Sequence, residues 1–88
     1  MLKISVVVES NLAVEFALEG KLVGPWVKEL RRLVRKALRE KKSVSLDLEH
    51  VWFVDSTGAA LLRDLTQKQV SQLNCSQFIR QQVEKVGK

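Results

Sequence analysis

A chain of 88 residues has room for one small domain with a single hydrophobic core. Hydrophobic residues make up 45% of it and charged residues 28%, a balance that excludes an intrinsically disordered chain. No apolar run approaches the roughly 20 residues that cross a bilayer, and the N-terminus has no apolar stretch long enough for a secretion signal. We therefore expect a cytoplasmic protein without direct membrane insertion.

The sequence offers few side chains for metal or redox chemistry. It contains one cysteine, Cys75, and one histidine, His50, which are too few for an internal disulfide or a structural zinc site. No glycine-rich phosphate loop and no HExxH motif accompanies them. We therefore expect no metal and no cofactor, and we predict that Cys75 is a small buried hydrophobic residue.

The N-terminal part of the chain predicts a β-hairpin. Residues 3–9 are rich in β-branched side chains, which favour a strand. Residues 13–19 alternate apolar and polar side chains, so Val14, Phe16 and Leu18 share one face. The Ser-Asn pair between the two segments is typical of a turn, which makes the two strands antiparallel neighbours.

Residues 24–42 change the period of the apolar side chains from that of a strand to that of a helix. Pro25 suits the first helical turn, where its missing N–H costs no hydrogen bond. The apolar stripe consists of Trp26, Leu30, Leu33, Val34 and Ala37, with Val27 and Leu38 beside it. We expect this stripe, including Trp26, to pack in the core.

The positive charge of the chain is concentrated on the same predicted helix. The net charge is +5, and the helix and its exit contain Lys28, Arg31, Arg32, Arg35, Lys36, Arg39, Lys41 and Lys42. Basic side chains are typical of the solvated face and the C-terminal end of a helix. The chain has no aromatic RNA-binding motif, so we expect no nucleic acid as a partner.

The rest of the chain alternates strands and helices. Residues 43–55 have strand character, residues 56–66 have helical spacing, and residues 70–73 form a short strand. Residues 74–86 predict an amphipathic helix that carries Phe78, Ile79, Gln82, Val83 and Val86 and is capped by Asn74 or Ser76. The order ββαβαβα predicts an α/β domain, in which parallel strand pairs accompany one antiparallel hairpin.

The sequence Asp-Ser-Thr-Gly, residues 55–58, falls where a strand becomes a helix, and we call it the DSTG loop. Asp55 or Ser56 is a good N-cap, and Gly58 provides flexibility or close backbone approach. A nucleophilic Ser56 would need His50 as its base, which lies six residues upstream on the same strand, so we expect no enzyme. A hydroxyl at a helix N-terminus is also a suitable phosphorylation site, because free N–H groups there accommodate a phosphate.

The segment SVSLDLEHVWFVDSTGAALLRDL, residues 43–65, resembles the signature of STAS domains, the fold of bacterial anti-sigma factor antagonists. The shared features are a strand with LDL, an apolar step that includes Phe53, and the DSTG loop opening a helix. The leading hairpin ending in LEG and the later elements extend the resemblance over the whole chain. It implies a STAS-like fold in a single domain over residues 1–88, with a small mixed sheet of four to five strands and about three helices.

The resemblance also implies a function without catalysis. In the family, a partner kinase phosphorylates the first hydroxyl after the Asp, which corresponds to Ser56; Thr57 is the alternative phosphosite. The partner is typically an anti-sigma factor that is also a GHKL-type serine kinase, and only the unphosphorylated antagonist sequesters it. A second function similar to that of known STAS proteins is an accessory subunit of a lipid ABC-type transport system, in which the hydroxyl serves assembly with the transporter ATPase.

Two further side chains are candidates for a partner surface around the DSTG loop. Strand alternation turns Trp52 to the face opposite Val51 and Phe53, so Trp52 is either an exposed interface anchor or is covered by a terminal helix or loop. Arg63, on the helix after the loop, either contacts a partner or is solvated. We therefore assign the partner-binding surface to the four residues of the DSTG loop together with Trp52 and Arg63.

Overall fold

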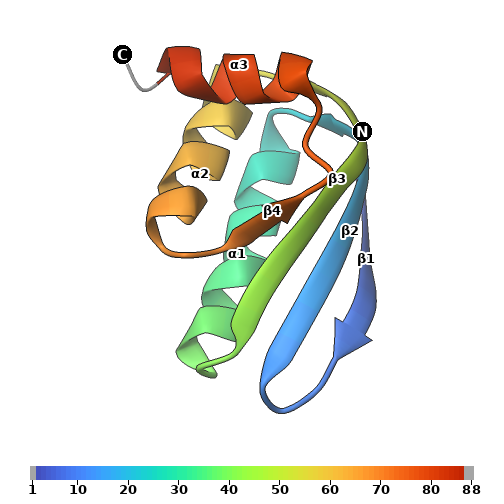
Figure 1. The fold of residues 1–88 in the computed structure, drawn as a ribbon, viewed down its shortest axis with the longest axis vertical. Helices are drawn as coiled ribbons and strands as arrows, with labels where there is room; N and C mark the ends of the chain where they lie inside the picture. Colours follow the sequence, from blue (N-terminus) through green and yellow to red (C-terminus); the bar gives the residue numbers. More distant parts are fainter. Residues whose placement is uncertain (1, 87–88) are drawn as a thin grey trace.

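The computed structural model describes residues 2–86, and its elements follow the predicted order (Figure 1). They are β1 (Leu2–Glu9), β2 (Ala13–Leu22), α1 (Pro25–Arg39), β3 (Ser43–Val54), α2 (Ser56–Gln67), β4 (Ser71–Leu73) and α3 (Gln77–Val86). The helix predicted over residues 24–42 is shorter, because the chain leaves the helix after Arg39 and Lys41 takes a positive φ of 61°. The predicted α/β order ββαβαβα is confirmed.

The strands within the described residues form one mixed four-stranded sheet in the order β1-β2-β3-β4. β1 pairs antiparallel with β2, whereas the β2–β3 and β3–β4 pairs are parallel. α1 and α2 run alongside each other against the sheet, and α3 packs on α2 (Figure 1). Because β2 and β3 are parallel, their carboxyl ends and the starts of α1 and α2 meet at one edge of the molecule.

The core is a single cluster of apolar side chains from the sheet and the helices. Its largest fully buried side chains are Leu18, Leu22, Leu30, Val34, Leu46, Leu48, Leu61, Leu62, Leu65 and Ile79. One prediction about this core was wrong. Trp26 is only half-buried, because it sits in the first turn of α1 at the rim of the cluster. Phe78 is 52% exposed, because neighbouring residues of a helix point about 100° apart and the adjacent Ile79 takes the core position.

The end of β3 departs from simple alternation because β3 carries two extra residues relative to β2. The ladder steps from Ala17–Asp47 to Glu19–His50, and then from Gly20–Val51 to Lys21–Phe53. Each extra residue reverses the side-chain phase, as in a β-bulge. The buried positions of β3 are therefore Val44, Leu46 and Leu48, followed by Val51 and Val54. The prediction that Phe53 faces the core with Val51 was wrong, since Phe53 is 41% exposed.

Polar side chains fix the start of α3. The Ser76 hydroxyl accepts a hydrogen bond from the Ile79 N–H at 3.1 Å. Of the two candidate caps in the sequence, Asn74 and Ser76, it is therefore Ser76 that caps α3. Asn74 has a positive φ of 57° and donates its side-chain N–H to the Asp47 carboxylate at 3.2 Å. Asp47 also accepts the Glu49 N–H, and these two bonds lower the pKa of Asp47. Asp47 therefore ties β3 to the segment between β4 and α3.

Candidate functional site

The DSTG loop lies at the edge of the molecule where β2 and β3 end and α1 and α2 begin (Figure 1). Leu22 and Val54, the last residues of the two strands, are partners in the parallel ladder. The Asp55 N–H also donates to the Leu22 carbonyl oxygen at 3.3 Å. The turn after β3 is thereby attached to the end of β2, which determines where α2 starts.

The Asp55 carboxylate accepts three hydrogen bonds and joins the N-termini of two helices. Its Oδ1 accepts from the Gly58 N–H at 2.7 Å and from the Thr57 hydroxyl at 2.8 Å. Its Oδ2 accepts from the Gly24 N–H at 3.1 Å, across 31 residues of chain. Asp55 is the N-cap of α2, and Gly24 is the N-cap of α1. The carboxylate therefore caps one helix and fastens it to the start of the other.

The same hydrogen bonds determine the ionisation of Asp55. Partial burial by itself raises the pKa of this carboxyl group, but the bonds from Gly58, Thr57 and Gly24 together outweigh burial and lower the pKa below its ordinary value. The group is therefore a carboxylate at neutral pH. Its negative charge at the start of α2 faces the positive end of the helix dipole, which is a favourable arrangement.

Gly58 is required by close packing, which was one of the two roles that its sequence position suggested. A Cβ atom on Gly58 would lie 2.4 Å from the Leu22 carbonyl oxygen, 3.1 Å from the Leu22 Cγ and 3.3 Å from the Asp55 Oδ1. The nearest of these atoms belongs to the backbone of β2, which cannot move without shifting the strand. Gly58 therefore lets the first turn of α2 rest directly on the end of β2.

The two hydroxyls of the DSTG loop are in different situations, although both residues are exposed. The Thr57 hydroxyl donates to the Asp55 carboxylate and so belongs to the helix cap. The Ser56 hydroxyl makes no hydrogen bond to any group within residues 2–86. Ser56 is the first residue of α2 and is therefore presented at the surface with its hydroxyl uncommitted.

Two exposed aromatic side chains precede the loop on β3. Trp52 is 62% exposed, so no terminal helix or loop among residues 2–86 covers its ring, and Phe53 is 41% exposed. The Lys21 ammonium, on the neighbouring strand, lies 4.7 Å from the centre of the Trp52 ring in a cation–π contact. The bulges of β3 thus leave two aromatic groups accessible within four residues of Ser56.

Arg63 lies apart from the other predicted site residues. It is half-buried seven residues beyond Ser56, about 10 Å along α2 at the usual helical rise. There it lines a hollow between α2 and α3 together with Gln72, Cys75 and Arg80. Trp52 therefore lies on the strand that leads directly into the DSTG loop, whereas Arg63 lies on a different part of α2.

Several residues considered from the sequence take no part in this site. His50 is exposed, with its Nε2 4.0 Å from the Glu49 carboxylate, and no hydrogen bond links it to Ser56 within residues 2–86. Cys75 is half-buried rather than fully buried, because it sits at the rim of the core, and burial raises the pKa of its thiol. No group of three or more potential metal ligands occurs in the described part of the chain. No helix among these residues is long and apolar enough to cross a membrane.

Sequence reasoning missed three residues of the site: Gly24, Lys21 and Phe53. Gly24 precedes Pro25 at the end of an apolar strand, and this Gly-Pro pair is a recognisable turn signal. Its hydrogen bond to Asp55 has no sequence signal, because the two residues are far apart in the chain. The positions of Lys21 and Phe53 depend on the second bulge of β3, which no residue pattern marks.

Comparisons with known proteins define the class of this domain. The STAS domain family matches residues 3–84, so the chain belongs to the STAS domain family, as residues 43–65 indicated. The solved structure of the anti-sigma factor antagonist SpoIIAA in its unphosphorylated form is similar, with a TM-score of 0.73 over 90% of this chain and 79% of that chain. The sequence identity is 20%, a level at which the similarity shows the shared fold. A comparison with curated proteins finds no match.

Proposed function

We propose that this chain is a non-enzymatic regulatory protein that acts as an anti-sigma factor antagonist and is switched off by phosphorylation of Ser56. Its partner is an anti-sigma factor that is also a GHKL-type serine kinase. The unphosphorylated chain sequesters this partner, and phosphorylation releases it. Membership of the STAS family and the fold shared with SpoIIAA support the proposal.

The observation that carries the proposal is the difference between two neighbouring hydroxyls. A kinase transfers the γ-phosphoryl group of ATP to a hydroxyl oxygen, which loses its proton while ADP leaves. The Ser56 hydroxyl is exposed and has no partner within residues 2–86, so it can enter a kinase site directly. The Thr57 hydroxyl is bonded to Asp55 at 2.8 Å, and its modification would break a cap contact of α2. Thr57 is therefore the alternative acceptor and Ser56 the preferred one.

Phosphorylation of Ser56 changes the surface of the domain more than its fold. It adds about 1.5 to 2 negative charges at neutral pH next to the ionised Asp55. The free N–H groups in the first turn of α2 can accommodate this charge, so the helix is retained. A partner that packs against Trp52 and Phe53 then meets a bulky anion at the edge of its contact. We therefore expect release of the partner without unfolding.

Phosphorylation by a cognate kinase tests this proposal. The purified chain is incubated with ATP and each GHKL-type kinase encoded in the same genome, and its intact mass is measured. We expect one phosphoryl group, located on Ser56 by fragmentation, in the wild type and in Thr57→Ala. Ser56→Ala should remain unmodified. An unchanged mass at Ser56 and Thr57 with every kinase contradicts the proposal.

Binding of the same kinase provides the second measurement. Ser56→Asp should weaken binding at least about tenfold, because it places a second negative charge beside Asp55. Ser43→Asp is the matched control, since Ser43 is exposed at the start of β3, at the other end of the strand from the DSTG loop. Equal affinities of the two variants contradict the switch. Copurification with an ABC-type ATPase and an unmodified Ser56 supports the accessory-subunit function instead.

A further inference from the structure

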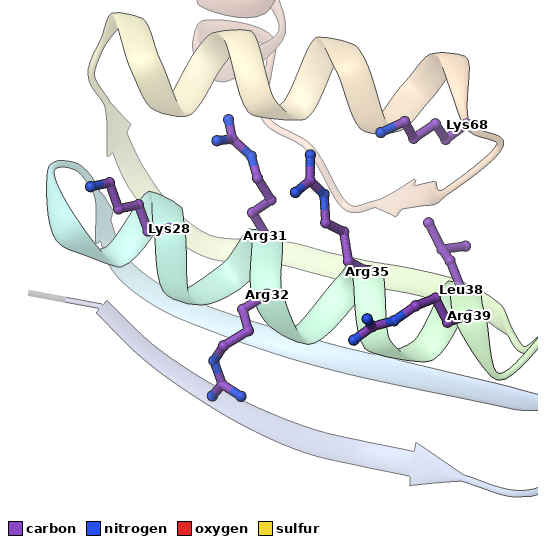
Figure 2. A pocket seen from close by; sticks show the side chains of 7 residues that line it. All are labelled: Lys28, Arg31, Arg32, Arg35, Leu38, Arg39 and Lys68. Carbon is purple, nitrogen blue, oxygen red and sulfur yellow. The ribbon is translucent and has the colours of Figure 1, made fainter.

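A groove between α1 and α2 is lined almost entirely by cationic side chains. Its volume is about 590 Å³, and its lining residues are Lys28, Arg31, Arg32, Arg35, Leu38, Arg39 and Lys68 (Figure 2). Six of the fifteen Lys and Arg residues of the chain therefore lie around one hollow, although the side chain of Arg32 points away from α2 (Figure 2). Neither the DSTG loop nor Trp52 lines it, so this surface is separate from the proposed phosphorylation site.

The cations of the groove form a line along α1. Lys28, Arg31, Arg35 and Arg39 follow one another at intervals of three, four and four residues, which spans about 16 Å at the usual helical rise. Arg31 and Arg35 extend from α1 toward α2, and Lys68 extends into the same space from the end of α2 (Figure 2). Arg32 points to the other side of α1, where it pairs with Glu29.

The stability of the fold does not explain this concentration of positive charge. The helix dipole favours Arg39 in the last turn of α1, but it disfavours Lys28 near the start, where the first turn contains no acidic residue. Like charges three and four residues apart also destabilise a helix. Within residues 2–86 no carboxylate lines the groove, and the one ion pair of a groove-facing cation is that of Lys68 with Asp64 at 3.1 Å. These charges therefore fit an anion supplied from outside the chain.

We propose that this groove is a second docking site, which binds an acidic amphipathic helix of a partner protein. A helix with carboxylates at three- and four-residue intervals repeats its charges at the same spacing as Arg31, Arg35 and Arg39. Guanidinium groups bind carboxylates through paired hydrogen bonds. Leu38 and the aliphatic stems of the arginines provide an apolar wall for the non-charged side of such a helix.

The lining of the groove favours this occupant over two other polyanions. Single-stranded nucleic acid binds through aromatic side chains that stack on bases, and no aromatic residue lines the groove. A membrane surface is flat, whereas these cations lie in a hollow between two helices (Figure 2). The large exposed apolar residues that anchor a peripheral protein in lipid are also absent from its lining, since Trp52, Phe53 and Phe78 all lie outside it.

Binding of a designed peptide to the full chain tests the proposal. The probe is a fluorescent helix-forming peptide of about 15 residues, with Glu at the spacing of the groove cations and Leu beside them. A second peptide carries Gln in place of every Glu. We expect the acidic peptide to bind and the Gln peptide to bind at least about tenfold more weakly. Raising the salt concentration from about 0.05 to 0.5 M should lower the affinity for the acidic peptide by a similar factor. Equal binding of both peptides overturns the proposal.

Two double variants and one control locate the binding. The double variant Arg31→Glu with Arg35→Glu should bind the acidic peptide at least about tenfold more weakly than the wild type. Arg31→Gln with Arg35→Gln should reduce the affinity to a smaller extent, without introducing new carboxylates. Lys36→Glu is the matched control, because Lys36 is exposed on the side of α1 that faces β1, and it should bind like the wild type. Unchanged affinity in a folded Gln variant overturns the assignment to this groove. Stronger binding of a DNA duplex or of anionic vesicles at the same salt overturns the assignment to a protein segment.

The outcome is independent of the proposed phosphorylation switch. The peptide experiment involves no kinase, and Ser56→Asp should leave peptide affinity unchanged, because the two surfaces share no residue. If no kinase modifies the chain but the acidic peptide binds, the phosphorylation switch is contradicted and the docking groove is supported. If a kinase modifies Ser56 but the acidic peptide does not bind, the docking groove is contradicted and the phosphorylation switch is supported.

Discussion

The substitution Gly58→Ala tests whether the close contact between α2 and β2 holds the DSTG loop in place. In an ordinary exposed helix, replacing Gly by Ala stabilises by about 1 kcal/mol, because Gly has the lower helix propensity. At residue 58 the added Cβ would instead lie 2.4 Å from the Leu22 carbonyl oxygen and 3.1 Å from its Cγ. Either the first turn of α2 moves away from β2, or β2 itself shifts. The packing argument therefore predicts a change opposite in sign to helix propensity.

The expected magnitude follows from these two opposing effects. Inserting a methyl group into a packed site that must rearrange costs about 1 to 3 kcal/mol. The upper part of this range applies here, because the contacted oxygen belongs to the backbone and already accepts the Asp55 N–H at 3.3 Å. Subtracting the propensity gain leaves a net destabilisation of about 1 to 2 kcal/mol. For a domain of this size, that difference lowers the melting temperature by about 4 to 16 °C.

Urea unfolding followed by far-UV circular dichroism measures this effect. Gly58→Ala should lower the urea midpoint with an unchanged slope, which indicates a change in stability rather than in the unfolded state. Ala60→Gly is the control, since Ala60 is exposed in the same helix. This substitution should cost only the difference in helix propensity, about 1 kcal/mol of unfolding free energy. If Gly58→Ala is as stable as the wild type or more stable, the close contact does not constrain α2 and the reasoning is refuted.

Three further predictions concern the caps and the exposed aromatic residue. Because the pKa of Asp55 is lowered in the folded chain, its contribution to stability is present at neutral pH and is lost as the pH falls below about 4; Asp55→Asn should flatten this acid dependence in urea unfolding at several pH values. Ser76→Ala should cost about 1 kcal/mol, measured in the same way, because it removes the cap of α3. Trp52→Ala should change stability by less than about 1 kcal/mol, since it loses only an exposed cation–π contact, whereas Leu46→Ala should cost about 2 to 5 kcal/mol. Large destabilisation by Trp52→Ala would show that its ring packs on the domain.

Elements with an undisturbed apolar period could be predicted from the sequence. The alternation in β2 correctly placed Val14, Phe16 and Leu18 in the core, and the helical spacing of α1 correctly placed Leu30 and Val34 there. In both elements only one face is buried, so the spacing of the apolar residues shows which side chains face the core. The position of the DSTG loop was predictable for a similar reason, because the change of period after residue 54 marks the boundary between strand and helix.

The predictions that were wrong fall where a local pattern does not determine the geometry. The second extra residue of β3 reverses the side-chain phase after Val51, so alternation counted from Val51 assigned Phe53 to the core face and the structure exposes it. In α3 the sequence offered both Phe78 and Ile79 as apolar side chains, and the packing of α3 against α2 and β3 places Ile79 in the core. The Gly24–Asp55 hydrogen bond depends on the parallel pairing of β2 with β3, which brings two distant turns together.

The geometry of the DSTG loop separates structural from accessible groups within four consecutive residues. Both oxygens of Asp55 are occupied by hydrogen bonds, the Thr57 hydroxyl is one of the donors, and the space above Gly58 is filled by Leu22. These three residues account for the cap of α2 and for its attachment to β2. Ser56 contributes to neither, although it occupies the first helical position, where Pro or Glu would suit the helix at least as well. The fold therefore does not use the hydroxyl of Ser56, the residue at which we propose phosphorylation, and Trp52 and Phe53 are exposed on the strand that precedes it.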